Sequence, residues 1–437
     1  MIPIWMFAAL FALVFAGIPV SFSLLATAFA FGLPLFGEKV VGIQLYGMVQ
    51  QTATQYLLSA VPPFVLMGCV LERSGIAERL FQVMQLWMGR MPGGLALATI
   101  TMGAIFAAST GIVGAVEVVI GVMTIPVMLR YGYNKSLIAG TICAGGSLGT
   151  MIPPSLVAVI YASIANMSVG KLYAAMLLPG LLMVGLFLIY IVGRCLLRPQ
   201  DGPPVAREQM SMPLAEKVKV TFTGLVPALL LIVAVLGTTM FGIASPTEAA
   251  SVGAFVALVL TALYRRLSWA VIRDALERTL LINCMILLIV VGGTMFASVF
   301  RLHGGEKLVQ NMVTDLGLST GLAILLCMAI VFAAGFILDW VSIVLICLPI
   351  FLPIVTALKI DPIWFATLMV IVIQTSYLTP PMAPSIFYLM SIAPKEITYR
   401  DMCLGVMPFV LMQIATLMAV ALFPLLATYL PAQFTGF

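Results

Sequence analysis

Apolar stretches long enough to cross a membrane alternate with short polar segments along the whole chain. A membrane-spanning helix needs about 20 mainly apolar residues, and every backbone polar group in lipid needs an internal partner. On this basis the pattern predicts an all-α polytopic membrane protein with five crossings in each half. The expected crossings lie near residues 3–17, 19–36, 55–73, 136–165 and 172–193, and near 222–241, 247–264, 279–301, 362–392 and 402–430.

Two further apolar stretches, about 94–128 and about 319–357, have small or polar residues at their centres. These centres are Ala108-Ser109-Thr110-Gly111 in the first stretch and Asp339-Trp340-Val341-Ser342 in the second. A helix facing lipid would be apolar there, so we interpret each stretch as a re-entrant hairpin covered by protein or by a water-filled cavity. Amphipathic arms are expected before the hairpins, at about 76–89 and 305–316.

The two halves resemble each other at an offset of about 227 residues. The pairs that keep this offset include Pro19 with Pro246, Pro126 with Pro353, and two double prolines. An odd number of crossings per half makes the halves inverted repeats. We therefore expect a first repeat over 1–197, a polar linker over 198–221 and a second repeat over 222–437. Paired, Pro-interrupted apolar segments in two halves point to the binding site of a transporter.

The double prolines are expected to break the crossings 136–165 and 362–392 into half-helices. Proline lacks an N–H and its ring clashes with the preceding turn, and glycine permits unusual backbone angles. The freed carbonyls and nearby hydroxyls can ligate a hard cation, and the N-terminal ends of half-helices attract anions. A pair of proline kinks packed only for shape is the alternative. The helix-breaking residues are Pro153, Pro154, Pro380 and Pro381.

Composition and charge support the membrane assignment. The 437 residues are 62% hydrophobic and 8% charged, whereas soluble domains carry roughly 25% charged residues. If the linker is cytoplasmic, 16 of the 21 Lys and Arg residues lie on the cytoplasmic side, as the positive-inside rule requires. Both termini then lie outside the cytoplasm.

Catalytic and metal-binding chemistry is not expected. The seven cysteines form no Cys-x-x-Cys pair and the chain has one histidine, His303. We expect no enzyme activity, no metal site and no cofactor. Acidic residues at membrane depth are functional candidates. Asp339 is expected to bind a cation or to orient its hairpin. Glu117 is expected to have a proton or ion role, or a structural role within its helix or between domains. Residues that could contact a substrate are Ser147, Ser155, Trp340, Ser342 and Ser385.

Several motifs resemble those of a known family, the large membrane subunit of tripartite ATP-independent periplasmic (TRAP) transporters, of the DctM type. They extend over essentially the whole chain: Gly17-Ile18-Pro19-Val20, Arg73-Ser74-Gly75-Ile76-Ala77, Ile125-Pro126, Ile152-Pro153-Pro154-Ser155, Ser245-Pro246-Thr247-Glu248-Ala249-Ala250, Leu338-Asp339-Trp340, Leu348-Pro349-Ile350-Phe351-Leu352-Pro353 and Leu378-Thr379-Pro380-Pro381. The first hairpin tip and the Gly-Gly-Ser run are similar to the branch that handles 2-oxo acids, mannitol-like compounds or chloroaromatic acids.

The resemblance implies an elevator-type secondary transporter of the bacterial inner membrane. It would import an organic acid anion such as a 2-oxo acid or dicarboxylate, with Na⁺ as coupling ion. Its partners would be a small four-helix membrane subunit and a periplasmic substrate-binding protein, with no nucleic acid. Each Na⁺ site would lie where a hairpin tip meets the broken helix of its half. The first would use Ser109, Thr110, Gly145, Gly146 and Thr150, and the second Gly335, Asp339, Thr375, Ser376 and Thr379. The first tip departs from the Ser-Gly-Ser form of many members.

Other functions remain open at this point. The nearest is a stand-alone Na⁺/dicarboxylate elevator carrier of the same superfamily, which would transport without a binding protein. A channel would show flux without saturation or coupling. An intramembrane enzyme would need a polar catalytic pair, which the sequence does not display.

Overall fold

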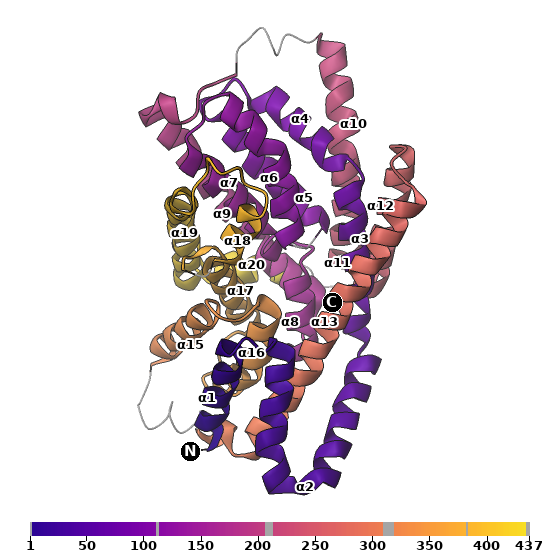
Figure 1. The fold of residues 1–437 in the computed structure, drawn as a ribbon, viewed down its shortest axis with the longest axis vertical. Coiled ribbons are helices and arrows are strands. Elements are labelled where there is room, and N and C mark those ends of the chain that lie inside the picture. Colours follow the sequence, from indigo (N-terminus) through magenta and orange to yellow (C-terminus); the bar gives the residue numbers. More distant parts are fainter. Residues whose placement is uncertain (1, 111–112, 206–212, 309–318, 382, 434–437) are drawn as a thin grey trace.

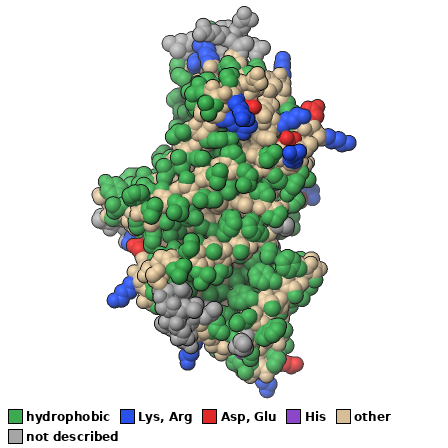
Figure 2. Space-filling model, turned by 90° about the vertical axis from the view of Figure 1, so that its left-hand side faces the viewer, with side chains coloured by type: hydrophobic (Ala, Val, Ile, Leu, Met, Phe, Trp, Pro, Cys, Tyr) green, Lys and Arg blue, Asp and Glu red, His purple; other side chains and the backbone are tan. Residues whose placement is uncertain are grey.

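A computed structural model describes residues 2–110, 113–205, 213–308, 319–381 and 383–433, and over these residues the secondary structure is helical with no strand. Eight helices are long and apolar enough to cross a membrane, judged by length and composition within the described residues. Figure 2 shows a broad hydrophobic band on one face, with Lys, Arg, Asp and Glu side chains mainly toward the two ends of the long axis. This distribution is that of a polytopic membrane protein, as expected.

The first half contains the elements α1 (Ile2–Phe15), α2 (Val20–Thr54), the 3₁₀ helix η1 (Tyr56–Ala60), α3 (Val61–Arg73), α4 (Ile76–Met88), α5 (Gly94–Thr110), α6 (Val113–Arg130), α7 (Lys135–Ser147), the 3₁₀ helix η2 (Leu148–Thr150), α8 (Leu156–Ala165) and α9 (Val169–Leu197). The predicted arm corresponds to α4, the first hairpin to α5 and α6, and the first broken helix to α7 and α8.

After the 3₁₀ helix η3 (Pro199–Asp201), the second half contains α10 (Leu214–Ile232), the π-helical turn η5 (Val233–Gly237), α11 (Thr238–Met240), α12 (Pro246–Leu263), α13 (Trp269–Leu302), α15 (Thr320–Ala334), α16 (Trp340–Ala357), α17 (Pro362–Leu378), α18 (Pro384–Met390), α19 (Tyr399–Leu422) and α20 (Leu425–Gln433). The order of arm, hairpin and broken helix therefore recurs, with α15 and α16 as the second hairpin and α17 and α18 as the second broken helix.

Side-chain caps define where several of these helices begin. Asn134 accepts hydrogen bonds from the backbone of α7, and Ser319, Asp361 and Thr398 do the same for α15, α17 and α19. Such caps satisfy N–H groups that have no partner within the helix. Within lipid this matters more than in water, because an unpaired backbone group there costs several kcal/mol.

The two hairpins lie toward opposite ends of the molecule. In Figure 1 the hairpin α5–α6 extends toward the end that holds α4 and the start of α10, and α15–α16 lies nearer the end that holds α1. Within each half, the first helix of the hairpin packs against the first part of the broken helix: α5 contacts α7, and α15 contacts α17. The same pairing at opposite ends is what inverted repeats produce.

Several boundaries differ from the prediction. Helix α13 begins at Trp269, ten residues before the predicted crossing 279–301. The crossing predicted at 19–36 continues as a second helical segment to Thr54, because Gly37 adopts φ 74° and reverses the chain; Figure 1 shows the two segments of α2 meeting at one end of the molecule. Helix α10 begins at Leu214, inside the predicted linker 198–221. The crossing predicted at 402–430 divides into α19 and α20, which flank Phe423-Pro424. Of the predicted arm 305–316, residues 305–308 are helical and the rest lies outside the described residues.

Candidate functional site

The first helix break lies where the double proline predicted it. Helix α7 ends at Ser147, a 3₁₀ turn follows, and α8 begins at Leu156. The peptide bond Pro153–Pro154 is cis, and neither proline can donate a backbone hydrogen bond. The hydroxyl of Ser155 donates to the Thr150 carbonyl at 2.7 Å and so closes the irregular segment.

The second break is its counterpart. Helix α17 ends at Leu378 and α18 begins at Pro384, with a cis bond between Pro380 and Pro381. The hydroxyl of Thr379 donates to the Thr375 carbonyl at 2.6 Å. Both helix-breaking pairs therefore occupy non-helical backbone between two half-helices.

At the first candidate cation site, the middle of α5 packs closely against the end of α7. A Cβ added at Gly103 would lie 2.9 Å from the backbone of Gly145, so the two helices touch at their backbones. Ser109 and Thr110 are buried in the last turn of α5 and donate to Ile105 and Phe106 carbonyls. Both hydroxyl oxygens keep lone pairs for a cation. The next two residues of the tip, 111 and 112, lie outside the described residues.

The other residues predicted at this site belong to the end of α7. Thr150 is buried, and its hydroxyl donates to the Ser147 carbonyl at 2.9 Å. Gly146 lies against the Glu117 side chain of α6, since an added Cβ would come within 2.0 Å of Glu117 Cγ. The C-terminal ends of α5 and α7 both carry partial negative charge, which favours a cation nearby.

At the second candidate cation site, the structure brings Gly335 and Ser376 together. Gly335 caps the C-terminus of α15, and a Cβ added there would lie 2.0 Å from Ser376 Oγ. The hydroxyls of Thr375 and Ser376 donate to Ile371 and Ile373 carbonyls within α17. Here the C-terminal ends of α15 and α17 meet beside hydroxyl oxygens that retain accepting lone pairs.

Asp339 lies at the tip of this hairpin as the N-cap of α16. Its carboxylate accepts the backbone N–H groups of Val341 at 3.1 Å and Ser342 at 3.4 Å, and the hydroxyl of Ser342. These contacts orient the tip. Trp340 is half-buried as the first residue of α16.

All four serines proposed to contact substrate are fully or almost fully buried and have partners within the protein, and that of Ser342 is Asp339. Ser147 and Ser155 donate to the carbonyls of Ala144 and Thr150. Ser385 donates to the carboxylate of Glu117. Ser385 therefore contacts an acidic side chain in this conformation.

One hydrogen bond joins matching positions of the two repeats. Gln374 Nε2 of α17 donates to the hydroxyl of Ser147 of α7 at 3.4 Å, and these residues are 227 apart. Equivalent positions can touch only near the axis that relates the repeats. Gln374 was not among the predicted site residues, although applying the repeat offset to Ser147 would have identified it.

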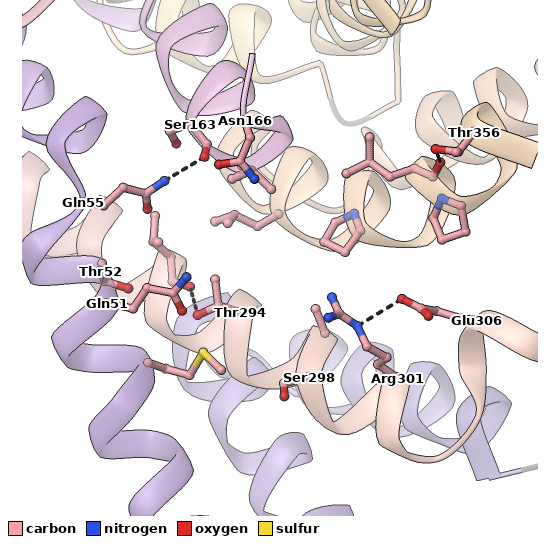
Figure 3. Close-up of a pocket in the computed structure, with 18 of the residues that line it drawn as sticks. Gln51, Thr52, Gln55, Ser163, Asn166, Thr294, Ser298, Arg301, Glu306 and Thr356 are labelled. Atoms are coloured by element: carbon pink, nitrogen blue, oxygen red, sulfur yellow. Dashed lines mark hydrogen bonds and ion pairs between the residues drawn. The ribbon is translucent and has the colours of Figure 1, made fainter. Parts of the chain in front are cut away.

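A cavity of about 670 Å³ lies between α2, α8, α13 and α16 (Figure 3). Gln55 Nε2 donates to the Ser163 carbonyl across it at 2.7 Å, and Arg301 pairs with Glu306 at 3.0 Å. The residues that line it are Met48, Gln51, Thr52, Gln55, Ser163, Ile164, Asn166, Val290, Thr294, Ala297, Ser298, Arg301, Glu306, Leu345, Pro349, Leu352, Pro353, Thr356 and Ala357.

None of the residues proposed to contact substrate is among those lining residues. The polar residues that do line the cavity were missed because they come from segments that the hydropathy pattern left unassigned or placed at the ends of crossings. The sequence could have identified these residues, because the segment from Gln50 to Gln55 is more polar than a lipid-facing helix.

The chain matches known proteins along most of its length. Residues 7–426 match the family model described as "Tripartite ATP-independent periplasmic transporter, DctM component". The chain is 33% identical over 388 residues to the C4-dicarboxylate TRAP transporter large permease protein DctM of Pseudomonas aeruginosa, covering 87% of this chain and 86% of that protein. It is 29% identical over 431 residues to the ectoine/5-hydroxyectoine TRAP transporter large permease protein UehC of Ruegeria pomeroyi, covering 97% of each.

A solved structure, that of the Alcanivorax borkumensis YdaH transporter, which is described as having an unusual topology, shares the fold. It superposes with a TM-score of 0.66 at 17% identity, covering 92% of this chain and 95% of that chain. Fold, helix breaks and family match agree along nearly the whole sequence: the chain belongs to the DctM family of large permease components of tripartite ATP-independent periplasmic transporters.

Proposed function

We propose that the protein is the membrane permease of a Na⁺-coupled transporter that imports an organic acid anion delivered by a periplasmic binding protein. The observation that supports this most directly is the repeated contact between a hairpin helix and a broken helix, at Gly103 with Gly145 and at Gly335 with Ser376. The second contact joins the C-terminal ends of α15 and α17, and the first joins the middle of α5 to the end of α7. The buried hydroxyls of Ser109 and Thr110 in the last turn of α5, and of Thr375 and Ser376 in α17, together with helix C-termini favour a small cation.

The opposite ends of the same breaks suit an anion. Helices α6, α8 and α18 begin at a hairpin tip or a helix break, and helix N-termini carry partial positive charge and N–H groups that have no partner within the helix. At the start of α16, Asp339 already accepts two of these N–H groups. A substrate carboxylate held there would lie close to the proposed cations. Coupling then follows from electrostatics, because occupied cation sites increase the attraction for the anion.

The cavity in Figure 3 bears on which elements would move during transport. Its walls come from α2 and α13 on one side and from α8 and α16 on the other. We propose that α2 and α13 belong to a fixed scaffold and that the hairpins and broken helices form a moving transport domain. In this elevator mechanism the cavity is the outward vestibule, and Arg301 draws anions toward it.

The partners follow from the family. A tripartite system with a DctM component implies two further components, which we take to be a small membrane subunit and a periplasmic binding protein. The relatives named for C4-dicarboxylates and for ectoine show that substrate differs among DctM proteins. We propose a carboxylate-containing substrate for this chain, because both of those substrate groups carry one.

The test is uptake of labelled organic acids into proteoliposomes that contain this chain and its small subunit, with an inward Na⁺ gradient. Each substrate is offered with and without binding proteins encoded nearby. Uptake that needs both Na⁺ and one binding protein is expected. Uptake with Na⁺ alone would instead support a stand-alone carrier, and uptake independent of Na⁺ would contradict the coupling.

A further inference from the structure

A polar pocket lies at the bend between α3 and α4, outside both candidate cation sites. It has a volume of about 290 Å³, is lined by α4, α10 and residues around the end of α12, and shares no lining residue with the cavity of Figure 3. The chain bends there at Gly75, whose φ of 77° favours glycine. In Figure 1, α4 and the start of α10 lie toward the end of the long axis opposite the turn in α2.

Close packing fixes the three elements that surround this pocket. A Cβ added at Gly224 of α10 would lie 3.0 Å from the backbone oxygen of Arg79 on α4. On the other side, the hydroxyl of Tyr264, the residue after α12, donates to the Thr223 carbonyl of α10 at 2.7 Å. The walls of the pocket therefore hold their relative positions without a ligand.

Three charged side chains line the pocket: Glu78 and Arg79 on α4, and Arg266 after α12. The ion pairs found among the described residues join other side chains. The Cζ atom of Arg79 lies 4.3 Å from the centroid of the Tyr264 ring, a contact that orients the guanidinium and leaves its charge in place. A Cβ added at Gly75 would lie 3.6 Å from Glu78 Oε2 and 3.7 Å from Arg266 Nε, so the acid and the base face the same point.

The neighbouring side chains are those expected at the level of lipid headgroups. Trp87 of α4 is exposed and its Nε1 donates to Thr221 of α10 at 2.9 Å, and Trp269 is exposed at the start of α13. Tryptophan is enriched at the membrane–water interface. Phe222 and Leu263, each next in sequence to a residue that lines the pocket, are exposed and apolar. A lipid whose headgroup entered the pocket would therefore find apolar surface for its acyl chains.

The charges in the pocket match a headgroup that carries a phosphate and a primary ammonium. The N–H groups of a guanidinium suit phosphate oxygens, and a carboxylate accepts hydrogen bonds from an ammonium. A purely anionic headgroup would be repelled by Glu78, and a quaternary ammonium has no N–H to donate. Basic pockets between membrane helices bind lipid headgroups in other proteins. We propose that this pocket binds phosphatidylethanolamine, with its phosphate at Arg79 and Arg266 and its ammonium at Glu78.

A lipid bound here joins the arm α4 to α10 and to the end of α12. Because α4 connects α3 to the first hairpin, the lipid fixes the arm at the point where that hairpin is attached. The inference needs neither a particular substrate nor Na⁺, so it goes beyond the proposed function and is tested separately from it.

The first experiment measures lipid binding to the purified, delipidated chain in detergent by native mass spectrometry. Phosphatidylethanolamine, phosphatidylcholine and phosphatidylglycerol are added in turn, and the wild type should bind phosphatidylethanolamine most tightly. Arg266→Gln should weaken this binding roughly tenfold, the change expected for the loss of a charge-assisted hydrogen bond. Arg265→Gln, which changes an exposed neighbour that does not line the pocket, is the matched control and should bind as the wild type does.

Glu78→Gln tests the assignment of the ammonium. This substitution removes the negative charge and leaves two positive ones, so the preference should change from phosphatidylethanolamine to phosphatidylglycerol. Glu216→Gln, which changes an exposed acid of α10 outside the pocket, should keep the preference of the wild type.

Three results would overturn the proposal. The first is equal affinity of the wild type for phosphatidylethanolamine and phosphatidylcholine. The second is equal affinity of Arg266→Gln and Arg265→Gln for phosphatidylethanolamine. The third is displacement of the lipid by an equal concentration of soluble phosphoethanolamine, which would mean that the pocket takes the free phosphate compound. None of these results would change the case for Na⁺ coupling.

A second measurement uses the wild type alone and so does not depend on how the variants fold. Phosphatidylethanolamine with a photoreactive group in its acyl chain should label the segments that contain Phe222 and Leu263. Excess unlabelled phosphatidylethanolamine should suppress this labelling, and excess phosphatidylcholine should not. Labelling that both lipids suppress equally would contradict a headgroup-specific site.

Discussion

Glycines allow α7 and α19 to approach each other closely. A Cβ at Gly140 of α7 would lie 2.1 Å from the carbonyl oxygen of Gly405 of α19, and one at Gly405 would lie 2.1 Å from the Ser136 carbonyl. Real Cβ atoms do not come this close to backbone oxygens. Small residues at such interfaces let membrane helices pack through their backbones, where no hydrophobic effect drives them together.

Gly140→Ala is therefore expected to destabilise the protein, by about 1–3 kcal/mol, as overpacking does in well-packed cores. Gly185→Ala in α9 is the control, since a Cβ there meets nothing within 4 Å. Thermal unfolding in detergent should show a lower midpoint for Gly140→Ala only. Equal midpoints would mean that α7 and α19 are further apart than the structure has them.

Substitutions of Asp339 can separate the effect of its charge from the effect of its capping role. Asparagine caps helix N-termini about as well as aspartate, so Asp339→Asn should preserve the tip while removing the negative charge. If the carboxylate contributes to the second cation site, uptake by Asp339→Asn will need more Na⁺ or will be lost. Asp339→Ala should additionally lower stability by about 1 kcal/mol.

The measurement is uptake against Na⁺ concentration, together with the unfolding midpoint of each variant. A Na⁺ response unchanged from wild type in Asp339→Asn would remove Asp339 from the cation site and leave it as a cap alone.

At the scale of elements, the proposed moving interface passes between α13 and α16. A Cβ at Gly293 of α13 would lie 2.8 Å from Leu345 Cβ of α16, while one at neighbouring Gly292 would lie 3.2 Å from Leu24 Cβ of α2. The first pair joins proposed scaffold to proposed transport domain. The second pair lies within the proposed scaffold.

Cysteine pairs at these positions test the movement in a background that lacks the native cysteines. A disulfide between Gly293→Cys and Leu345→Cys should stop uptake, and reduction should restore it. A disulfide between Gly292→Cys and Leu24→Cys should leave uptake unchanged. Full uptake with the first disulfide formed would contradict the elevator mechanism.

Hydropathy predicted elements well where a crossing is largely apolar, as in α9 and α12, and the double prolines predicted both breaks. It missed the first ten residues of α13, which carry four charged side chains. It failed at residues 38–54, because this helix is too polar to register as a crossing and its place depends on packing against α13. The contact of Glu117 with Ser385, 268 residues apart, follows no local spacing rule. Such a pair becomes visible only when the fold brings α6 to α18.

For the whole molecule, the orientation in the membrane is the property most directly open to test. Lys39, beside the turn in α2, and Glu216, near the start of α10, are exposed. The turn in α2 and the start of α10 lie toward opposite ends of the long axis (Figure 1). The distribution of basic residues predicts that the α10 end lies in the cytoplasm.

In a variant without the exposed native Cys284, a membrane-impermeant thiol reagent added outside should label Lys39→Cys. It should label Glu216→Cys only after the membrane is opened. The reverse pattern would invert the topology and would place the cavity of Figure 3 on the cytoplasmic side.

The contact between Ser147 and Gln374 has a consequence for the energetics of the cycle. If two inverted repeats were identical, exchanging their conformations would turn the outward-facing state into the inward-facing one at no change in free energy. At the axis itself this protein has a hydroxyl on one repeat and an amide on the other, so the exchange is not neutral. In the proposed elevator mechanism, the differences between paired positions would set the resting ratio of the two facing states, and the residues at the axis would contribute to it without touching ion or substrate.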